Sequence, residues 1–384
     1  MPRVHLRAWQ DEAIAKWIAA GHRGIVAVVT GGGKTVFALA CVERLRPQTV
    51  LVVVPTIALL DQWWEEAANY FNLPLEDIHV VSGSRGMKTG TINLAILNTA
   101  AELQARGHSH KCMLVVDECH KVASPLYKKV LNITTVASLG LSATPKRPYD
   151  SGLESVLVPA LGPVIYRYSY KEALRDGVIV PFNLRNVVFD LEEEKKVEYD
   201  RLTKAIARSI DKHGIDAPEV VQLFIRRARV LNLSINRVRL ALKLVSSNRG
   251  RRILVFHEDI AACNLIHEVL TDNGVSAGVY HSKMRTKERV CMLNAYRNGK
   301  LDVLVTCRAL DEGFNVPETE IGIIAASTAT QRQRIQRLGR VLRPATGKDG
   351  ATIYTLVATD PEVARLKKEE EDLDGVANVS WARA

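Results

Sequence analysis

The sequence predicts an α/β protein with two tandem domains, each built on a parallel β-sheet that is covered by helices. Short apolar runs alternate with helix-like segments over the first 150 residues, and a second alternation of the same kind begins near Arg252. Such alternation is typical of parallel sheets with crossover helices. A chain of 384 residues is also longer than one ordinary hydrophobic core needs. Ligands of such sheets bind beside the carboxyl ends of the strands, so functional residues are expected there.

Eleven apolar runs have the length and composition of buried strands. In the first half they are residues 25–29, 50–54, 78–81, 94–97, 113–116 and 136–139, and in the second half residues 253–256, 276–280, 303–306, 321–325 and 352–356. Helical periodicity is expected over residues 36–45, 57–70, 260–270, 286–297 and 331–338.

The predicted domains are residues 1–165 and 251–384, joined by a helical basic connection over residues 166–250. Residues 191–210 are rich in helix-favouring side chains, and residues 220–252 contain nine Arg or Lys and no acidic residue. Arg226 and Arg229 fall one helical turn apart, as do Arg239 and Lys243. The basic stretch is either a solvated helical face or a surface that binds nucleic acid. We favour nucleic acid, bound electrostatically by Arg226, Arg227, Arg229, Arg237 and Arg239, because counter-charges are absent.

The composition is that of a globular protein with a basic surface. The chain has 52 basic and 42 acidic residues, a net charge of +10 and an isoelectric point near 9.3. Such a charge attracts polyanions, of which nucleic acid is the commonest. The apolar stretch over residues 50–60 is too short to cross a bilayer, and the N-terminus lacks the pattern of a secretory signal. The six cysteines lack Cys-x-x-Cys spacing, which favours buried thiols in a reducing compartment. We expect the cytoplasm of a bacterial, archaeal or phage-infected cell, or a eukaryotic nucleus.

A glycine-rich loop after the first strand has the chemistry of a triphosphate site. Glycines let backbone N–H groups turn toward phosphate oxygens, and the next helix points its positive end at the anion. Lys34 is expected to reach the β- and γ-phosphates, and the Thr35 hydroxyl to coordinate Mg²⁺. The usual pattern has Gly or Ala where this chain has Val28, and an ordinary glycine turn is the alternative. The loop consists of Thr30, Gly31, Gly32, Gly33, Lys34 and Thr35.

An acidic pair, Asp117 and Glu118, follows the strand predicted at residues 113–116. A carboxylate at a strand end can hold Mg²⁺ through its waters, and its neighbour can deprotonate an attacking water. A helix N-terminal cap is the alternative interpretation. The combination with the glycine loop favours a nucleoside triphosphatase.

The motifs resemble those of the superfamily 2 helicases and translocases over nearly the whole chain. The resemblance implies two RecA-like domains, ATP and Mg²⁺ as cofactors, and nucleic acid as partner. Residues 6–14 are similar to the segment that recognises adenine, in which Arg7 and Gln10 would contact the base. Residues 54–62 resemble motif Ia, whose Thr56 would contact a strand phosphate, and Thr99 lies where another strand contact is expected.

Three further motifs complete the resemblance. Residues 140–145 resemble motif III, with Ser142 and Thr144 as its hydroxyls. Thr306 and residues 311–317 resemble motif V, in which Thr306 would contact the strand and Gly313 and Asn315 the nucleotide, although the family often has Asp at the position of Asn315. Residues 333–343 match motif VI, which implies catalytic roles for Gln333, Arg340 and Arg343, the two arginines as fingers on the γ-phosphate.

The resemblance is strongest to the XPB-type DNA-repair helicases and the type III restriction motor subunits. It implies an ATP-dependent helicase or translocase on single-stranded, double-stranded or branched DNA, for which a monomer is a plausible state. The catalytic residues would be Lys34, Asp117 and Glu118 with the motif VI residues, while His281 and Ser282 could approach a strand phosphate. An RNA helicase and an ATP-switched nucleic-acid-binding module are the alternatives.

Overall fold

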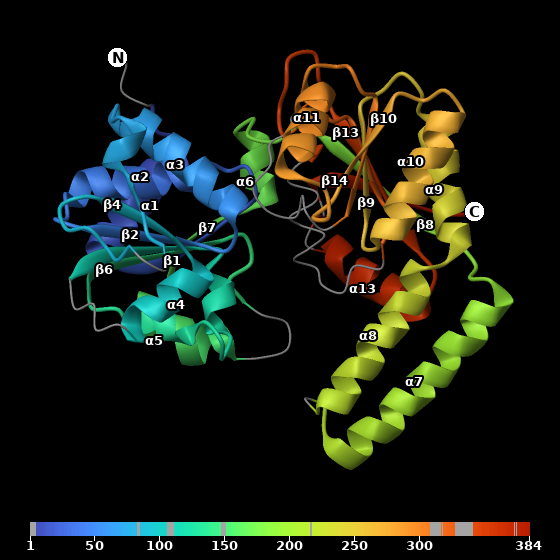
Figure 1. Ribbon diagram of the computed structural model, residues 1–384, viewed down its shortest axis with the longest axis horizontal. Coiled ribbons are helices and arrows are strands. Elements are labelled where there is room, and N and C mark those ends of the chain that lie inside the picture. The colour runs from blue at the N-terminus through green and yellow to red at the C-terminus, as the bar shows by residue number, and fades with distance from the viewer. Residues whose placement is uncertain are drawn as a thin grey trace. The chain divides into compact units, whose positions relative to one another are not determined.

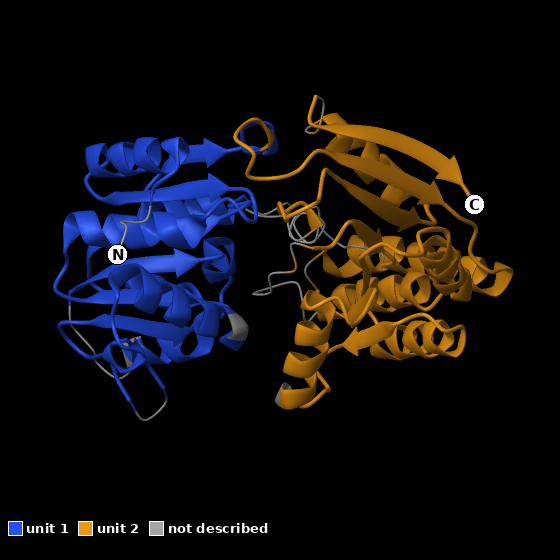
Figure 2. Cartoon of the chain, turned by 90° about the horizontal axis from the view of Figure 1, so that it is seen from above, with its two compact units in different colours: residues 1–173 blue, residues 174–384 orange. Residues whose placement is uncertain are grey.

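A computed structural model gives the fold (Figure 1). It describes residues 5–82, 85–105, 111–146, 151–215, 217–307, 316, 318–326, 341–371, 373 and 375–384. The chain divides into two compact units, residues 1–173 and 174–384 (Figure 2). None of the helices in the described part is long and apolar enough to cross a membrane.

The first unit is built on a seven-stranded parallel sheet with the order β3-β4-β2-β5-β6-β1-β7. Its strands are β1 (Arg23–Val28), β2 (Val50–Val54), β3 (His79–Val80), β4 (Ile92–Ile96), β5 (Cys112–Asp117), β6 (Thr135–Ser142) and β7 (Val164–Tyr168). Its helices are α1 (Ala8–Ala19), α2 (Lys34–Leu45), α3 (Ile57–Phe71), α4 (Leu97–Ala105) and α5 (Val158–Leu161). Helices α1 to α3 lie on one face of the sheet, and α4 and α5 lie on the other (Figure 1).

The second unit repeats this plan with the strand order β10-β11-β9-β12-β13-β8-β14, again parallel throughout. Its strands are β8 (Phe182–Val188), β9 (Ile253–His257), β10 (Ala277–Tyr280), β11 (Val303–Cys307), β12 (Ile321–Ile324), β13 (Ala351–Val357) and β14 (Ala377–Arg383). Its helices are α7 (Glu193–His213), α8 (Pro218–Asn232), α9 (Ile235–Ser247), α10 (Ile260–Asp272), α11 (Thr286–Arg297) and α13 (Asp360–Glu371), and α6 (Tyr170–Arg175) spans the boundary of the units.

The tandem α/β architecture predicted from the alternation is confirmed, and the eleven predicted strands are present with shifted ends. Sequence patterns missed β7, β8 and β14. Strands β8 and β14 are neighbours at one end of the second sheet. Buried residues alternate with more exposed ones over the first half of β8, and β14 has no buried residue, so neither strand is a continuous apolar run. The helix predicted over residues 331–338 lies outside the described residues.

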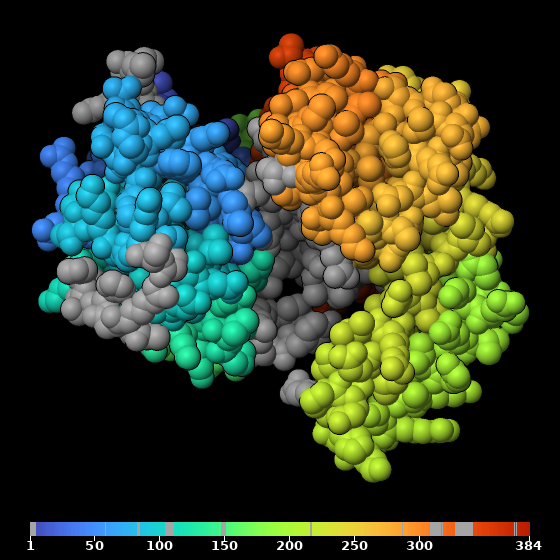
Figure 3. All heavy atoms as spheres, viewed as in Figure 1, coloured from blue at the N-terminus to red at the C-terminus, as the bar shows by residue number. Residues whose placement is uncertain are grey.

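The segment 166–250, expected to connect two domains, divides differently in the structure. Residues 166–173 belong to the first unit and residues 174–250 to the second. The physical reason is that β8 pairs with both β13 and β14, and that α9 packs its apolar face on the core of the second sheet. Helices α7 and α8 form a hairpin that stands out from the rest of this unit, as the space-filling view also shows (Figures 1 and 3).

Candidate active site

The sequence-predicted residues of the first unit follow neighbouring parallel strands, so they lie along one edge of its sheet. In the strand order β4-β2-β5-β6-β1, the residues just beyond or at the strand ends are Thr99, Thr56, Asp117, Ser142 and Thr30. Parallel pairing brings all carboxyl ends to the same edge. The structure therefore assembles one site from segments more than a hundred residues apart.

The glycine loop joins β1 to α2 and has the backbone conformation of a phosphate cradle. Gly31 and Gly33 have φ angles of 85° and 96°, which other residues rarely adopt. A Cβ on Gly32 would lie 2.4 Å from Val28 Cγ1, so this position has no room for a side chain. The Thr30 hydroxyl is buried and has no hydrogen-bond partner, and Thr35 is half-buried in the first turn of α2. The loop thus leaves a buried hydroxyl available, which fits a bound anion.

The acidic pair lies at the end of β5 and is buried. Glu118 has φ 48° and ψ 48°, a left-handed conformation that is uncommon for a glutamate and that turns the chain into the next short helix. Asp117 accepts hydrogen bonds on both carboxylate oxygens. The Glu118 N–H donates to Oδ1 at 2.9 Å, and the Trp63 indole N–H donates to Oδ2 at 2.9 Å.

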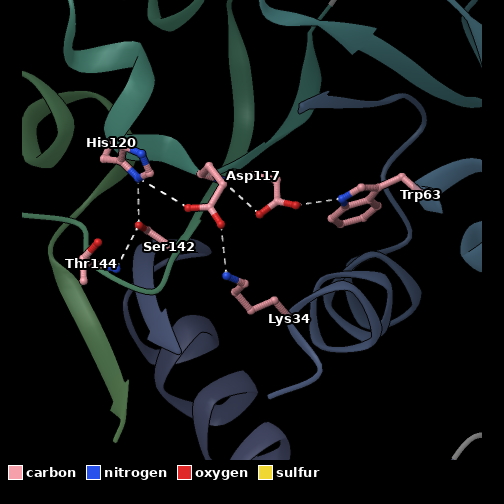
Figure 4. Close-up of polar contacts among 7 residues, drawn as sticks. Lys34, Trp63, Asp117, His120, Ser142 and Thr144 are labelled. Carbon is pink, nitrogen blue, oxygen red and sulfur yellow. Dashed lines mark hydrogen bonds and ion pairs between the residues drawn. The ribbon is translucent and has the colours of Figure 1, made fainter. Parts of the chain in front are cut away.

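Lys34 forms an ion pair with Glu118, in which Nζ lies 3.4 Å from Oε1 (Figure 4). Burial acts to raise the pKa of Glu118, but the nearby charges of Lys34, His120 and Lys121 outweigh it and hold that pKa below its ordinary value. For Asp117 burial prevails over the attraction of Lys34, and its pKa is raised. The two environments therefore shift the pKa values of the two carboxyl groups in opposite directions.

His120 connects the acidic pair to the motif at the end of β6. Its Nδ1 lies 3.0 Å from Ser142 Oγ and 3.4 Å from Glu118 Oε2. Ser142 Oγ also accepts the backbone N–H of Thr144 at 3.1 Å (Figure 4). A chain of polar contacts therefore connects Glu118 through His120 to Ser142 and Thr144.

Gln10 tethers α1 to the glycine loop. Its Nε2 donates to Gly33 O at 3.0 Å, and its Oε1 accepts the backbone N–H of Arg7 at 2.8 Å. The Arg7 side chain is exposed, whereas Gln10 is buried. Both residues lie beside the loop, where a nucleotide base contact was predicted, and that contact stays a prediction.

Comparison with known proteins gives the site its context. Residues 3–147 match the family described as "Type III restriction enzyme, res subunit", and residues 236–345 match "Helicase conserved C-terminal domain". The chain is 28% identical over 391 residues to the DNA 3'-5' translocase XPB2 of Sulfurisphaera tokodaii, covering 96% of this chain and 85% of the relative. The chain is thus similar to the superfamily 2 helicase-type ATPases over both of its units. Within that superfamily it resembles the XPB group.

Two further comparisons agree with this assignment. The chain is 25% identical over 364 residues to the DNA 3'-5' helicase XPB of Kineococcus radiotolerans, covering 92% of this chain and 60% of the relative. Its fold resembles the solved structure of the ATP-dependent Type ISP restriction-modification enzyme LlaBIII bound to DNA, with a TM-score of 0.66 and 16% identity. That match covers 99% of this chain and 31% of the restriction enzyme. These likenesses support the recognition of the fold as two RecA-like units.

The residues of the first unit suit a nucleotide held with a magnesium ion. Lys34 and the loop N–H groups offer positive charge to phosphates, and Thr35 and Asp117 offer the oxygen ligands that Mg²⁺ prefers. Mg²⁺ in such sites is usually bound by one or two protein side chains together with phosphates and water. Among the described residues no group of three or more His, Cys, Asp and Glu side chains could hold a metal.

The residues predicted to contact a nucleic-acid strand lie at strand ends in both units. Thr56 caps helix α3, and its hydroxyl accepts the Leu59 N–H at 3.3 Å. Thr99 is half-buried in the first turn of α4. Thr306 is buried at the end of β11 with a hydroxyl that lacks a hydrogen-bond partner, and Ser282 is exposed just beyond β10. Strands β10 and β11 are parallel neighbours, so Ser282 and Thr306 share one edge of the second sheet.

The basic stretch separates into surface and core residues. Arg226 and Arg229 are exposed on α8, and Arg239 is exposed on α9. Arg237 was expected to join them on a nucleic-acid surface, and this expectation is wrong. Its guanidinium is fully buried, donates to the carbonyl oxygens of Leu231 and Leu356, and lies 3.6 Å from the carboxylate of Glu362.

Several motif residues of the second unit lie outside the described residues, namely Gly313, Asn315, Gln333 and Arg340. Arg343, the last residue of motif VI, is described and is half-buried. Its carbonyl oxygen accepts a hydrogen bond from Lys348 Nζ at 2.8 Å. This hydrogen bond links Lys348 to the last residue of motif VI.

Sequence analysis missed two residues of the site. Trp63 occupies an apolar position in the periodicity of α3, so nothing in the pattern distinguished its indole from an ordinary core side chain. His120 was visible as part of the acidic motif, but its bond to Ser142 depends on the parallel pairing of β5 and β6. Pairing of this kind follows from the tertiary fold.

Proposed function

We propose that this protein is a DNA translocase or helicase that couples hydrolysis of Mg²⁺-bound ATP to movement along DNA or separation of its strands. The observation that carries the proposal is the joint placement of the glycine loop, the Lys34–Glu118 ion pair and Asp117 at one sheet edge. Relatives named as DNA 3'-5' translocase and helicase support DNA as the polymer and 3'-to-5' as the direction. A chromosomal compartment, the cytoplasm of a prokaryote or a nucleus, follows from that partner.

Bound MgATP would supply the γ-phosphoryl group whose transfer to water releases free energy. Within this chain, Lys34 neutralises phosphate charge that the loop N–H groups also attract. Asp117 would hold the Mg²⁺ shell through carboxylate oxygens that its hydrogen bonds already orient. Glu118 would orient the attacking water and accept its proton. The resemblance of residues 333–343 to motif VI implies that Arg340 and Arg343 would stabilise the charge that develops during transfer.

Strand contacts are assigned to Thr56, Thr99, Ser282 and Thr306, and a supporting electrostatic contact to the arginines of α8 and α9. Phosphate contacts of this kind bind the backbones of DNA and RNA alike, so RNA is the alternative substrate. A solved RNA-bound structure, S. cerevisiae Dbp5 with ADP BeF3, shares the fold with a TM-score of 0.63 and 13% identity. The relatives named for DNA cover more than nine-tenths of this chain at higher identity, which favours DNA.

ATP turnover measured with single-stranded DNA, duplex DNA, forked DNA and RNA tests this proposal. We expect DNA to stimulate turnover more strongly than RNA. Strand displacement from substrates with 3' or 5' overhangs then tests the direction, and displacement or triplex removal distinguishes unwinding from translocation. If only RNA stimulates ATP turnover, RNA replaces DNA as the proposed substrate. If neither DNA nor RNA changes the rate of ATP hydrolysis, the proposal is contradicted.

Neutralising Arg226, Arg229 and Arg239 together tests the electrostatic contact. Each lost phosphate contact should reduce the slope of log K against log salt by about 0.9, so three contacts should reduce it by about 2.7. The matched control neutralises Lys204, Arg208 and Lys212, three exposed basic residues on one face of α7 that lie among acidic neighbours. Equal salt slopes for the triple variant and wild type would restore the interpretation of a solvated face.

A further inference from the structure

Trp63 makes a contact that its position in a helix does not require. It lies in the middle of α3, is 1% exposed, and donates its indole N–H to Asp117 Oδ2 at 2.9 Å (Figure 4). A buried indole N–H needs an acceptor, but a backbone carbonyl would serve, as Leu75 O does for Trp64 at 2.8 Å. Here the acceptor is a buried carboxylate at the proposed Mg²⁺ site, fifty-four positions away in the sequence.

The contact fixes the orientation of that carboxylate. The Glu118 N–H binds Oδ1 and the Trp63 indole binds Oδ2, so rotation of the carboxylate about its last bond would break both hydrogen bonds. Each carboxylate oxygen keeps a second lone pair for a metal or its waters. Partners that orient a metal ligand in this way commonly tune metal affinity.

Helix α3 also carries a proposed strand contact. Its N-cap is Thr56, and Trp63 lies seven residues later, two turns along the same helix. The cap hydrogen bond from Leu59 N–H to Thr56 Oγ1 fixes the start of the helix. A displacement of the α3 N-terminus is therefore transmitted through the helix to the indole and from the indole to Asp117.

We propose that Trp63 is a positioning residue that orients Asp117 for Mg²⁺ and links this carboxylate to the nucleic-acid contact at Thr56. The inference rests on the proposed function, because it takes Mg²⁺ and a strand phosphate as the ligands. It goes beyond that function by assigning the coupling to one hydrogen bond. If the bond couples the sites, nucleic acid must raise the apparent Mg²⁺ affinity and Mg²⁺ must raise nucleic-acid affinity by the same factor.

The first experiment measures binding of a non-hydrolysable fluorescent ATP analogue while Mg²⁺ is titrated, without nucleic acid. In Trp63→Phe the Mg²⁺ midpoint should rise about 10- to 100-fold, the usual effect of removing an outer-sphere partner of a metal ligand. Binding of the analogue in EDTA should change little, because the loop and Lys34 are untouched. Trp64→Phe is the matched control, since it removes an indole hydrogen bond on the same helix without touching the acidic pair.

A second variant separates the hydrogen bond from packing. Replacing Trp63 by β-(3-benzothienyl)alanine keeps the bicyclic ring and exchanges the N–H for sulfur, so the fold is retained even if Trp63→Phe fails to fold. An unchanged Mg²⁺ midpoint in this variant would overturn the inference, because the bond would then have no effect on the metal.

The coupling is tested by repeating the titration with saturating single-stranded DNA. Wild-type protein should show a lower Mg²⁺ midpoint with DNA, and the benzothienyl variant should lose most of that shift while still binding DNA. If wild-type protein binds the Mg²⁺-nucleotide but no nucleic acid, the proposed function fails while the metal-positioning role of Trp63 stands. If the DNA-induced shift is the same in both proteins, α3 is not linked to Asp117 through the indole.

Discussion

Replacing Arg237 by methionine is expected to destabilise the second unit strongly, although Arg237 belongs to a stretch that looks like a nucleic-acid surface. Its guanidinium donates to Leu231 O at 3.1 Å and to Leu356 O at 2.8 Å, and lies 3.6 Å from Glu362 Oε1. It also stacks over the Phe189 ring at 5.0 Å from the ring centroid. These partners join α9 to β13, α13 and the end of α8.

The magnitude follows from what methionine leaves behind. Glu362 is 4% exposed, so the variant would bury a carboxylate without its cation, together with two carbonyl oxygens that lose a donor. Breaking a buried pair from one side typically costs about 3–5 kcal/mol in the free energy of unfolding. With a urea m-value near 3 kcal/mol/M, the unfolding midpoint of this unit should fall by about 1–1.7 M.

Urea denaturation followed by far-UV circular dichroism measures this change. Arg239→Ala is the control, because Arg239 is two positions away and exposed, and its loss should change the free energy of unfolding by less than about 0.5 kcal/mol. Adding Glu362→Gln to Arg237→Met should recover part of the lost stability, because it removes the uncompensated charge. A single variant that unfolds at the wild-type urea concentration would refute the reasoning.

Three further predictions concern the phosphate loop, the acidic pair and the half-buried Lys348. Glu118→Gln should lower ATP turnover by about 10²–10⁴-fold but still bind nucleotide, whereas Lys34→Ala should lose both turnover and nucleotide binding. An ATPase assay and a direct binding assay measure the two properties. Wild-type turnover in Glu118→Gln would show that Glu118 is not the base. Gly32→Ala should weaken nucleotide binding by about tenfold or more, on the order of the cost of a displaced phosphate contact. The new Cβ would lie 2.4 Å from Val28 Cγ1, so adding Val28→Ala should restore part of the nucleotide affinity. Burial lowers the pKa of Lys348 to about 8, only partly opposed by the charges of nearby glutamates, so the folded state releases its proton before the unfolded state does. The free energy of unfolding of wild type relative to Lys348→Met should therefore rise between pH 8 and about pH 10.5, and parallel pH profiles of the two proteins would show that the lysine is not perturbed.

Local sequence patterns were enough to predict the fold class, which the structure confirms, and to propose a triphosphate site. Central strands such as residues 50–54 and 253–257 are continuous apolar runs because both faces of a parallel sheet are covered, so their pattern is visible without tertiary information. The glycine loop and the acidic pair were also visible, because their chemistry requires specific residue types at short spacing. Local patterns of this kind need no knowledge of what lies across the sheet.

Tertiary packing distinguishes residues that look alike in the sequence, because it sets whether each one is buried and which partner it contacts. Arg237 and Arg239 stand two apart in one basic helix, but the helix turns one into the core toward Glu362 and the other toward solvent. Trp63 follows the same apolar periodicity as its neighbours, and only the packing of α3 against the end of β5 sets its N–H against Asp117. The physical reason is that a buried polar group needs a hydrogen-bond or charged partner, and the partners of Arg237 and Trp63 come from segments far away in the chain.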